Sequence, residues 1–123
     1  MQDKHYKKFE DLHCWQEART LVKMVYLITR EQPFAKDFGL CDQLKRSAVS
    51  VMANIAEGFG TFSDTEFIRF LNFTVRSCCE VQSHLYVAKD VEYINDLQFT
   101  ELYEQTTKCD KITRGLIKYL KNK

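Results

Sequence analysis

Residues 38–60 read FGLCDQLKRSAVSVMANIAEGFG, and their spacing decides the fold. Apolar residues recur at the 3.6-residue period of a helix, on a face formed by Leu40, Leu44, Val51 and Ile55. A second row, where a solvent-facing helix usually carries Lys and Glu, consists of Gln43, Ser47, Ser50, Asn54 and Glu57. Few long charged side chains are left to hold water on this helix. We therefore expect other helices to cover it on more than one side.

The composition of the 123-residue chain is that of one globular domain, residues 1–123. One Pro and four Gly leave little material for hairpin turns, and no alternating run is bounded by turn residues, so we expect an all-α protein. Its net charge of +1 excludes a strong global attraction to nucleic acid or anionic lipid, but it leaves a local basic patch open.

The N-terminal sequence and the cysteines indicate a cytoplasmic protein. MQDKHYKKFEDL lacks the apolar core of a signal peptide, and no apolar run approaches the roughly 18 residues that span a bilayer, so no membrane partner is expected. The cysteines have no CxxC spacing and no paired His, which argues against a zinc site or a redox motif. They are Cys14, Cys41, Cys78, Cys79 and Cys109. In a reducing compartment we expect most of them to be buried, with one of the adjacent Cys78 and Cys79 open to solvent.

The first two helices have recognisable ends. The first is predicted to begin near Asp11, as its N-cap, and to end before Pro33. The second is predicted to start within residues 37–40 and to stop at Gly58–Gly60, because glycine can take the left-handed conformation that ends helices.

The last two helices each open on a capping signature. Ser63 with Glu66 three residues later predicts the start of the third helix, and Asn95 with Gln98 predicts the start of the fourth. Short connections favour antiparallel neighbours, so we expect an up-down-up-down four-helix bundle.

This topology gathers the N-terminus, the turn after the second helix and the C-terminus at one end of the bundle. The cations and aromatic residues that we expect there, or on the adjoining face of the last helix, are Lys4, Lys7, Lys8, Phe59, Phe62, Lys111, Arg114, Lys118 and Lys121. Cations neutralise phosphates and rings stack on unpaired bases, so this end is a candidate site for RNA or single-stranded DNA. The structural alternative is that the cations offset the helix dipole while the phenylalanines pack on the turn.

A polar cluster of Arg46, Asn54, Glu57 and Glu80 is expected between the second and third helices. One interpretation is that it fixes the register between helices or subunits, since buried polar groups need partners. The alternative is a ligand-binding or enzymatic site. No phosphate-binding glycine loop, nucleophile elbow or Cys–His pairing supports catalysis, so we expect no enzyme.

A metal centre is not expected either. Glu80 and His84 are spaced one helical turn apart, and Glu57 could face them. A di-iron bundle, however, requires two Glu-x-x-His motifs and further glutamates, and the sequence does not contain that set. We therefore expect neither a metal nor another cofactor.

Residues 12–34, LHCWQEARTLVKMVYLITREQPF, followed by residues 38–60, closely resemble a known four-helix-bundle family. The family is named for proteins encoded in intervening sequences of bacterial 23S rRNA genes and is also called the S23 ribosomal protein family. Nearly the whole chain takes part in the resemblance. The matching positions are Trp15, Gln16, Ala18, Phe38, Gly39, Leu40, Gln43, Arg46, Ser50, Asn54, Ile55, Ala56, Glu57, Gly58, Phe67, Phe70, Leu71, Ser77 and Glu80.

The resemblance implies an antiparallel four-helix protomer that assembles into a homo-oligomeric ring, typically a pentamer, without an established enzymatic activity. The residues then expected to serve packing and assembly are Gln43, Arg46, Ser50, Asn54, Glu57, Gly58 and Glu80. Relatives commonly have Gly where this chain has Arg76, which would alter a helix contact or place a charge on the surface. The leading hypothesis is a binding or scaffold protein for RNA or a ribonucleoprotein. A scaffold for protein partners without nucleic acid is the alternative.

Overall fold

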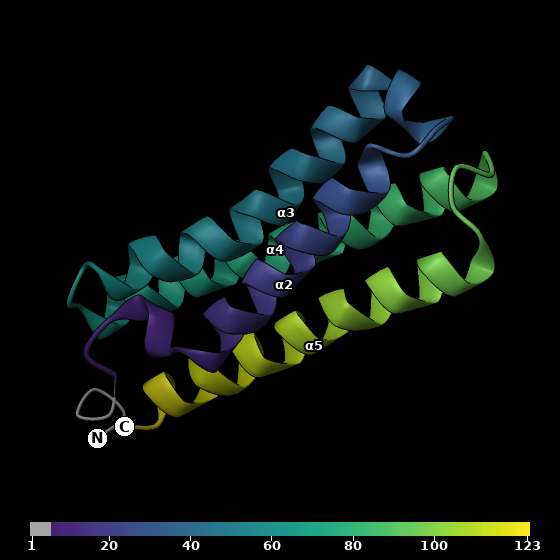
Figure 1. Cartoon of the computed structure of the whole chain (residues 1–123). Coiled ribbons are helices and arrows are strands. Elements are labelled where there is room, and N and C mark those ends of the chain that lie inside the picture. Colours follow the sequence, from purple (N-terminus) through teal and green to yellow (C-terminus); the bar gives the residue numbers. More distant parts are fainter. Residues whose placement is uncertain (1–5) are drawn as a thin grey trace.

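The computed structural model describes residues 6–123, which form an all-α bundle without strands in that range. Its elements are η1 (Phe9–Asp11), α2 (His13–Thr29), η2 (Phe34–Lys36), α3 (Phe38–Phe59), α4 (Asp64–Asp90) and α5 (Asp96–Lys121). The four α-helices run up, down, up and down, so the prediction of an antiparallel four-helix bundle is confirmed (Figure 1). None of the helices in residues 6–123 has the length and apolar character needed to cross a membrane.

Three helix starts are capped by side chains, and for two of them the sequence predicts the capping residue. The Asp37 carboxylate accepts the Leu40 N–H at 3.0 Å at the start of α3, and the Ser63 hydroxyl accepts the Glu66 N–H at 3.3 Å at the start of α4. At the start of α5, the Gln98 N–H donates to the Asn95 side chain and the Asn95 N–H donates to the Gln98 side chain, each at 2.8 Å. This reciprocal pair is the predicted capping box.

Two local predictions are wrong, each because a competing contact prevails. Asp11 belongs to η1 and accepts the Lys7 N–H, while α2 begins after Leu12, which gives no side-chain cap. The Glu66 carboxylate does not return a capping bond to Ser63, because it accepts two bonds from the Arg69 guanidinium.

The end of α3 lies where it is predicted, with Phe59 as its last residue and Gly60 as its C-cap, but no left-handed glycine ends it. No glycine in residues 6–123 has a positive φ, and Gly60 closes α3 at φ −72°. The left-handed residue of the α3–α4 turn is Phe62, at φ 54°. The left-handed residue comes two residues after Gly60, because the last turn of α3 first tightens through bonds such as Thr61 N–H to the Gly58 carbonyl.

The core lies along the inner faces of all four helices. Fully buried members include Leu21, Val25, Leu44, Ala48, Val51, Ile55, Leu71, Val81, Leu85 and Cys109. Removal of this apolar surface from water is the main favourable contribution to folding. Side-chain bonds join α5 to its two neighbours, Gln105 to Glu17 of α2 at 2.9 Å and Gln82 of α4 to Thr107 at 2.9 Å.

Small residues let α3 and α4 approach closely. Ser77 donates to the Ser50 hydroxyl at 2.8 Å, and the buried Thr74 hydroxyl donates to the Val51 carbonyl at 3.1 Å. Near the turn, a Cβ on Gly58 would lie 2.7 Å from the Cβ of Phe70, closer than atoms can pack. The small polar row of α3 is therefore partly a helix–helix seam. Ser47 is buried, Ser50 and Asn54 are half-buried, and Gln43 and Glu57 remain exposed.

Alanine at two of the helical glycines, Gly58 and Gly115, is expected to have opposite effects. Gly58→Ala should destabilise the fold by about 1–2 kcal/mol, because overpacking against Phe70 outweighs the better helix propensity of alanine. Gly115→Ala should stabilise it by roughly 0.5–1 kcal/mol, since nothing lies within 4 Å of the added Cβ. Denaturant unfolding of both variants measures the difference. Equal effects of the two substitutions would refute the close approach at Gly58.

Candidate nucleic-acid interface

The predicted end of the bundle is present in the structure. The N-terminal segment, the α3–α4 turn and the C-terminus lie together (Figure 1). An ion pair fixes this arrangement, because the Lys123 ammonium lies 3.1 Å from the Asp64 carboxylate at the start of α4. The residues expected to bind nucleic acid divide between two cavities at this end.

The first cavity is a groove between α4 and α5 of about 370 Å³. Its lining consists of Asn72, Val75, Arg114, Ile117, Lys118, Lys121 and Asn122. The Arg114 Nε donates to both carboxylate oxygens of Asp110, at 2.9 and 3.1 Å, so its charge is partly neutralised. None of the ion pairs formed within residues 6–123 involves Lys118 or Lys121. Two exposed ammonium groups beside side-chain amides make the groove suited to phosphate.

The second cavity, of about 220 Å³, lies at the α3–α4 turn. Its lining consists of Tyr6, Lys7, Gly58, Phe59, Phe62, Ser63, Asp64 and Phe67. Phe59 is half-buried and its ring meets the Phe67 ring edge-on, with centroids 5.9 Å apart. Phe59 therefore forms part of the cavity wall. Phe62 is 92% exposed and is the aromatic side chain that offers its ring to solvent.

The other predicted cations are not brought into these cavities. Lys8 and Lys111 are exposed and line neither cavity, so they contribute to the field around the end rather than to a defined pocket. Lys4 lies outside the described residues.

The polar cluster predicted between α3 and α4 is not assembled by hydrogen bonds or ion pairs. Arg46 donates to Asp42, one helical turn earlier on α3, at 2.9 Å. Asn54 donates to the Ser50 hydroxyl at 2.9 Å, and so takes part in the α3–α4 seam. Glu57 is exposed at the opposite end of α3 from Arg46. These side chains therefore serve separate contacts and do not form one site.

His84 on α4 is half-buried, and it belongs to no cluster of metal ligands within residues 6–123. His84 Nε2 lies 3.7 Å from the Glu80 carboxylate, and this nitrogen has no hydrogen-bond partner. Within residues 6–123, no group of three or more His, Cys, Asp or Glu side chains is placed to hold a metal ion.

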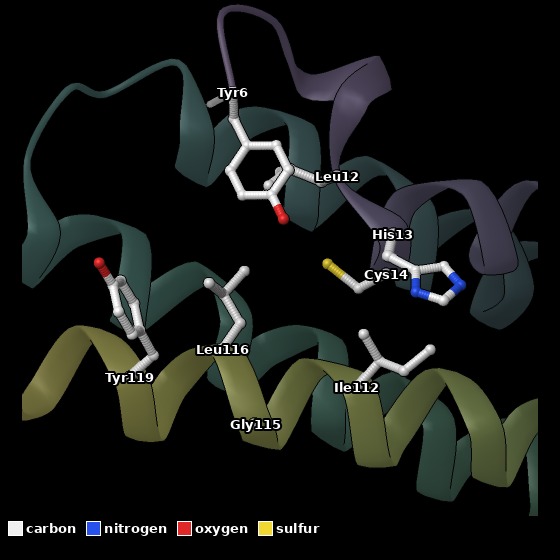
Figure 2. A pocket seen from close by; sticks show the side chains of 8 residues that line it. All are labelled: Tyr6, Leu12, His13, Cys14, Ile112, Gly115, Leu116 and Tyr119. Carbon is white, nitrogen blue, oxygen red and sulfur yellow. The ribbon is translucent and has the colours of Figure 1, made fainter. Parts of the chain in front are cut away.

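A third cavity of about 320 Å³ lies between the start of α2 and the end of α5. In Figure 2 the Tyr6 hydroxyl and the Cys14 sulfur point into it, and the His13 imidazole points away. Burial raises the pKa of the Cys14 thiol to about 12, so the thiol stays protonated at neutral pH. With His13 turned aside, no base is placed to activate this sulfur, and the cavity shows no nucleophilic pair.

Sequence reasoning missed one feature of the α4 surface, an alternating set of guanidinium and phenyl groups. The Arg69 guanidinium lies over the rings of Phe70 and Phe73, at 4.8 and 5.4 Å from their centroids, and the Arg76 guanidinium lies 5.5 Å from the Phe73 centroid. The signal in the sequence is RFLNFTVR at residues 69–76, in which arginine and phenylalanine recur three and four residues apart. Arg76 is exposed, so it places a charge on the protomer surface.

The family model of the 23S rRNA-intervening sequence protein matches residues 10–115. The chain belongs to this family. A similar solved structure is that of a protein with unknown function from the S23 ribosomal protein family of Bacteroides thetaiotaomicron VPI-5482. The two sequences are 26% identical, and the two structures superpose with a TM-score of 0.78. The match covers 85% of this chain and 95% of that chain. No curated protein matches the chain. The predicted family and fold are both confirmed, and the family's function is unknown.

Alkylation is expected to distinguish one cysteine from the other four. Cys79 is exposed, whereas Cys14, Cys41, Cys78 and Cys109 are buried. Burial raises the pKa of Cys109 to about 12 and raises that of Cys78 as well, which leaves almost no reactive thiolate. Iodoacetamide at mildly alkaline pH should therefore modify Cys79 alone in the folded protein, as mass spectrometry of peptides would show.

The variant Cys79→Ser is the control for this experiment. It should stay unmodified until denaturant is added, after which all four remaining cysteines should react. Modification of a second cysteine before unfolding would contradict the burial described above.

Proposed function

We propose that this member of the family is a cytoplasmic, non-catalytic binding protein that works as a homo-oligomer. The resemblance to the family favours a ring, typically a pentamer, as its assembled form. The proposed ligand of its basic end is RNA or single-stranded DNA.

The groove between α4 and α5 carries this proposal. Lys118 and Lys121 project from the last turns of α5 and form no ion pair with any residue of the range 6–123, and Asn72 and Asn122 add neutral hydrogen-bond groups. Phosphate contacts of this kind supply most of the affinity for a nucleic-acid backbone. With a net charge of only +1, binding would depend on this local patch rather than on the whole surface. The groove offers donors and an apolar floor, a composition that supports binding more than catalysis.

The outer face of α3 supports assembly from several copies. Val49 is 39% exposed and Ala53 beside it is small, so a neighbouring backbone could approach closely. Arg46 and Glu57 carry opposite charges toward the two ends of this face. A second copy that covers this face would remove Val49 from water and could pair the two charges.

Arg46→Ala and Glu57→Ala are each expected to lower the mass of the oligomer while leaving the helical fold intact. Both side chains are exposed on the protomer, so either change should alter protomer stability by only about 0.5 kcal/mol or less. Light scattering measures the mass, and circular dichroism measures the helix content. Lys23→Ala and Glu104→Ala, at exposed positions of α2 and α5, are the matched controls. A monomeric wild type, or variants with the wild-type mass, would count against this interface.

The double variant Lys118→Gln/Lys121→Gln is expected to weaken the binding of a labelled single-stranded RNA. The slope of log affinity against log salt concentration should become shallower by about 1.4, because each phosphate contact on a single strand contributes roughly 0.7. Fluorescence anisotropy at a series of salt concentrations gives both the affinity and the slope.

The matched control for this measurement is Lys23→Gln/Lys36→Gln. It removes the same charge from exposed positions on α2 and η2, outside both cavities of the basic end, so its slope should equal that of the wild type. Absence of wild-type affinity at low salt would refute the proposed function. Equal slopes for the two double variants would show that the groove is not the phosphate site.

A further inference from the structure

Phe62 has two properties that do not stabilise the protomer. Its backbone has φ 54°, in the left-handed region that is unfavourable for a bulky side chain, and its ring is 92% exposed. Its N–H reaches the Phe59 carbonyl only at 3.4 Å, a long bond. Backbone strain of this kind is characteristic of functional sites. We therefore expect the contact that offsets this strain to come from a molecule outside the protomer.

Glu92, in the α4–α5 turn, shows what a compensated left-handed residue looks like. Its φ is 64°, and the following N–H of Tyr93 closes the helix on the Ala88 carbonyl at 2.8 Å. Tyr93 then stacks on Phe34 and donates to Asp37 at 3.0 Å. These contacts stabilise the turn around Glu92. The turn at Phe62 is held by its neighbours, because the Thr61 hydroxyl donates to the Gly58 carbonyl at 2.7 Å, whereas the Phe62 ring itself stays 92% exposed.

The geometry points to a pocket for one unpaired nucleobase at this turn, an inference that rests on the proposed function. Phe62 lines the 220 Å³ cavity together with the aromatic rings of Tyr6, Phe59 and Phe67. This volume lies below the roughly 300–1,000 Å³ of sites for drug-sized ligands, so it suits a single ring system rather than a base pair. A base in the cavity would stack against the exposed Phe62 ring.

Cations around the cavity favour a nucleic acid over an uncharged aromatic occupant, because the Asp64 carboxylate in the lining is paired with Lys123. The exposed Lys7 is part of the lining, and Lys8 is exposed beside it in the chain. Lys118 and Lys121 lie at the same end of the bundle, in the groove between α4 and α5. Phosphates on either side of the bound base would meet these ammonium groups. The groove thus holds the backbone of the strand, and the turn holds one of its bases.

The variant Phe62→Asn tests the pocket, because it should change binding and stability in opposite directions. Asparagine tolerates the left-handed conformation, so the melting temperature should rise by about 2–4 °C. Affinity for a single-stranded RNA should fall about tenfold or more, since one base–aromatic stack is lost. The slope against log salt should stay at the wild-type value, because no phosphate contact is removed.

The matched control is Phe38→Asn. Phe38 is also a largely exposed phenylalanine, 80% exposed, but it lies at the start of α3, at the opposite end of the bundle. This change should give neither the rise in melting temperature nor the loss of affinity. The same RNA annealed to its complement is the second control, and it should bind the wild type and Phe62→Asn equally, because it offers no unpaired base.

The possible outcomes separate the pocket from the function on which it rests. If Phe62→Asn binds as the wild type does while Lys118→Gln/Lys121→Gln loses affinity, the pocket is refuted and the proposed function stands. If the wild type binds no RNA at low salt, both are refuted. A lower melting temperature of Phe62→Asn would show that the ring serves the fold instead. A lower mass by light scattering would show that a second copy occupies the cavity, and would also overturn the inference.

Discussion

The close approach of α3 and α4 is the constraint on which the rest of the structure depends. Gly58 leaves no room for a Cβ against Phe70, and Ser50 and Ser77 join the two helices by a direct hydroxyl contact. Long side chains at these positions would push the helices apart and expose the buried Val51 and Leu71. Because α3 and α4 are held closely up to their shared turn, the position of that turn is fixed. The basic end therefore follows from the small residues of the seam.

The sequence predicts those parts of the fold that depend on local hydrogen bonds and on helical period. Ser63 and Asn95 cap their helices as expected, since a side-chain oxygen within three residues of a free N–H needs no tertiary partner. Predictions fail where two local contacts compete. Glu66 pairs with Arg69 on its own helix rather than returning a bond to the cap, and Asp11 stays in η1. Such competition is decided by side-chain conformations that spacing alone does not specify.

The candidate site could be predicted in outline for the same reason. Helix number and direction place the chain ends and the α3–α4 turn together, so the cations there are recoverable from sequence. The distribution of charge within the end is not. Asp110 partly neutralises Arg114, and Asp64 binds Lys123, so Lys118 and Lys121 remain as the cations of the groove that have no ion-pair partner among the described residues 6–123. Pairing of this kind depends on the rotation of each helix about its axis, which a hydrophobic pattern fixes only approximately.

In the turn between α3 and α4, different residues of one short segment serve stability and the proposed binding. Gly58 serves the fold, because its missing side chain lets Phe67 and Phe70 pack against α3. Phe62, four residues later, is strained and exposed, and so it detracts from the stability of the protomer. A glycine or asparagine would serve the turn better if the turn were only a connection. The strain at Phe62 is tolerated because the packing of α3 on α4 fixes the end of α3. A turn held in this way can keep a residue in an unfavourable backbone conformation.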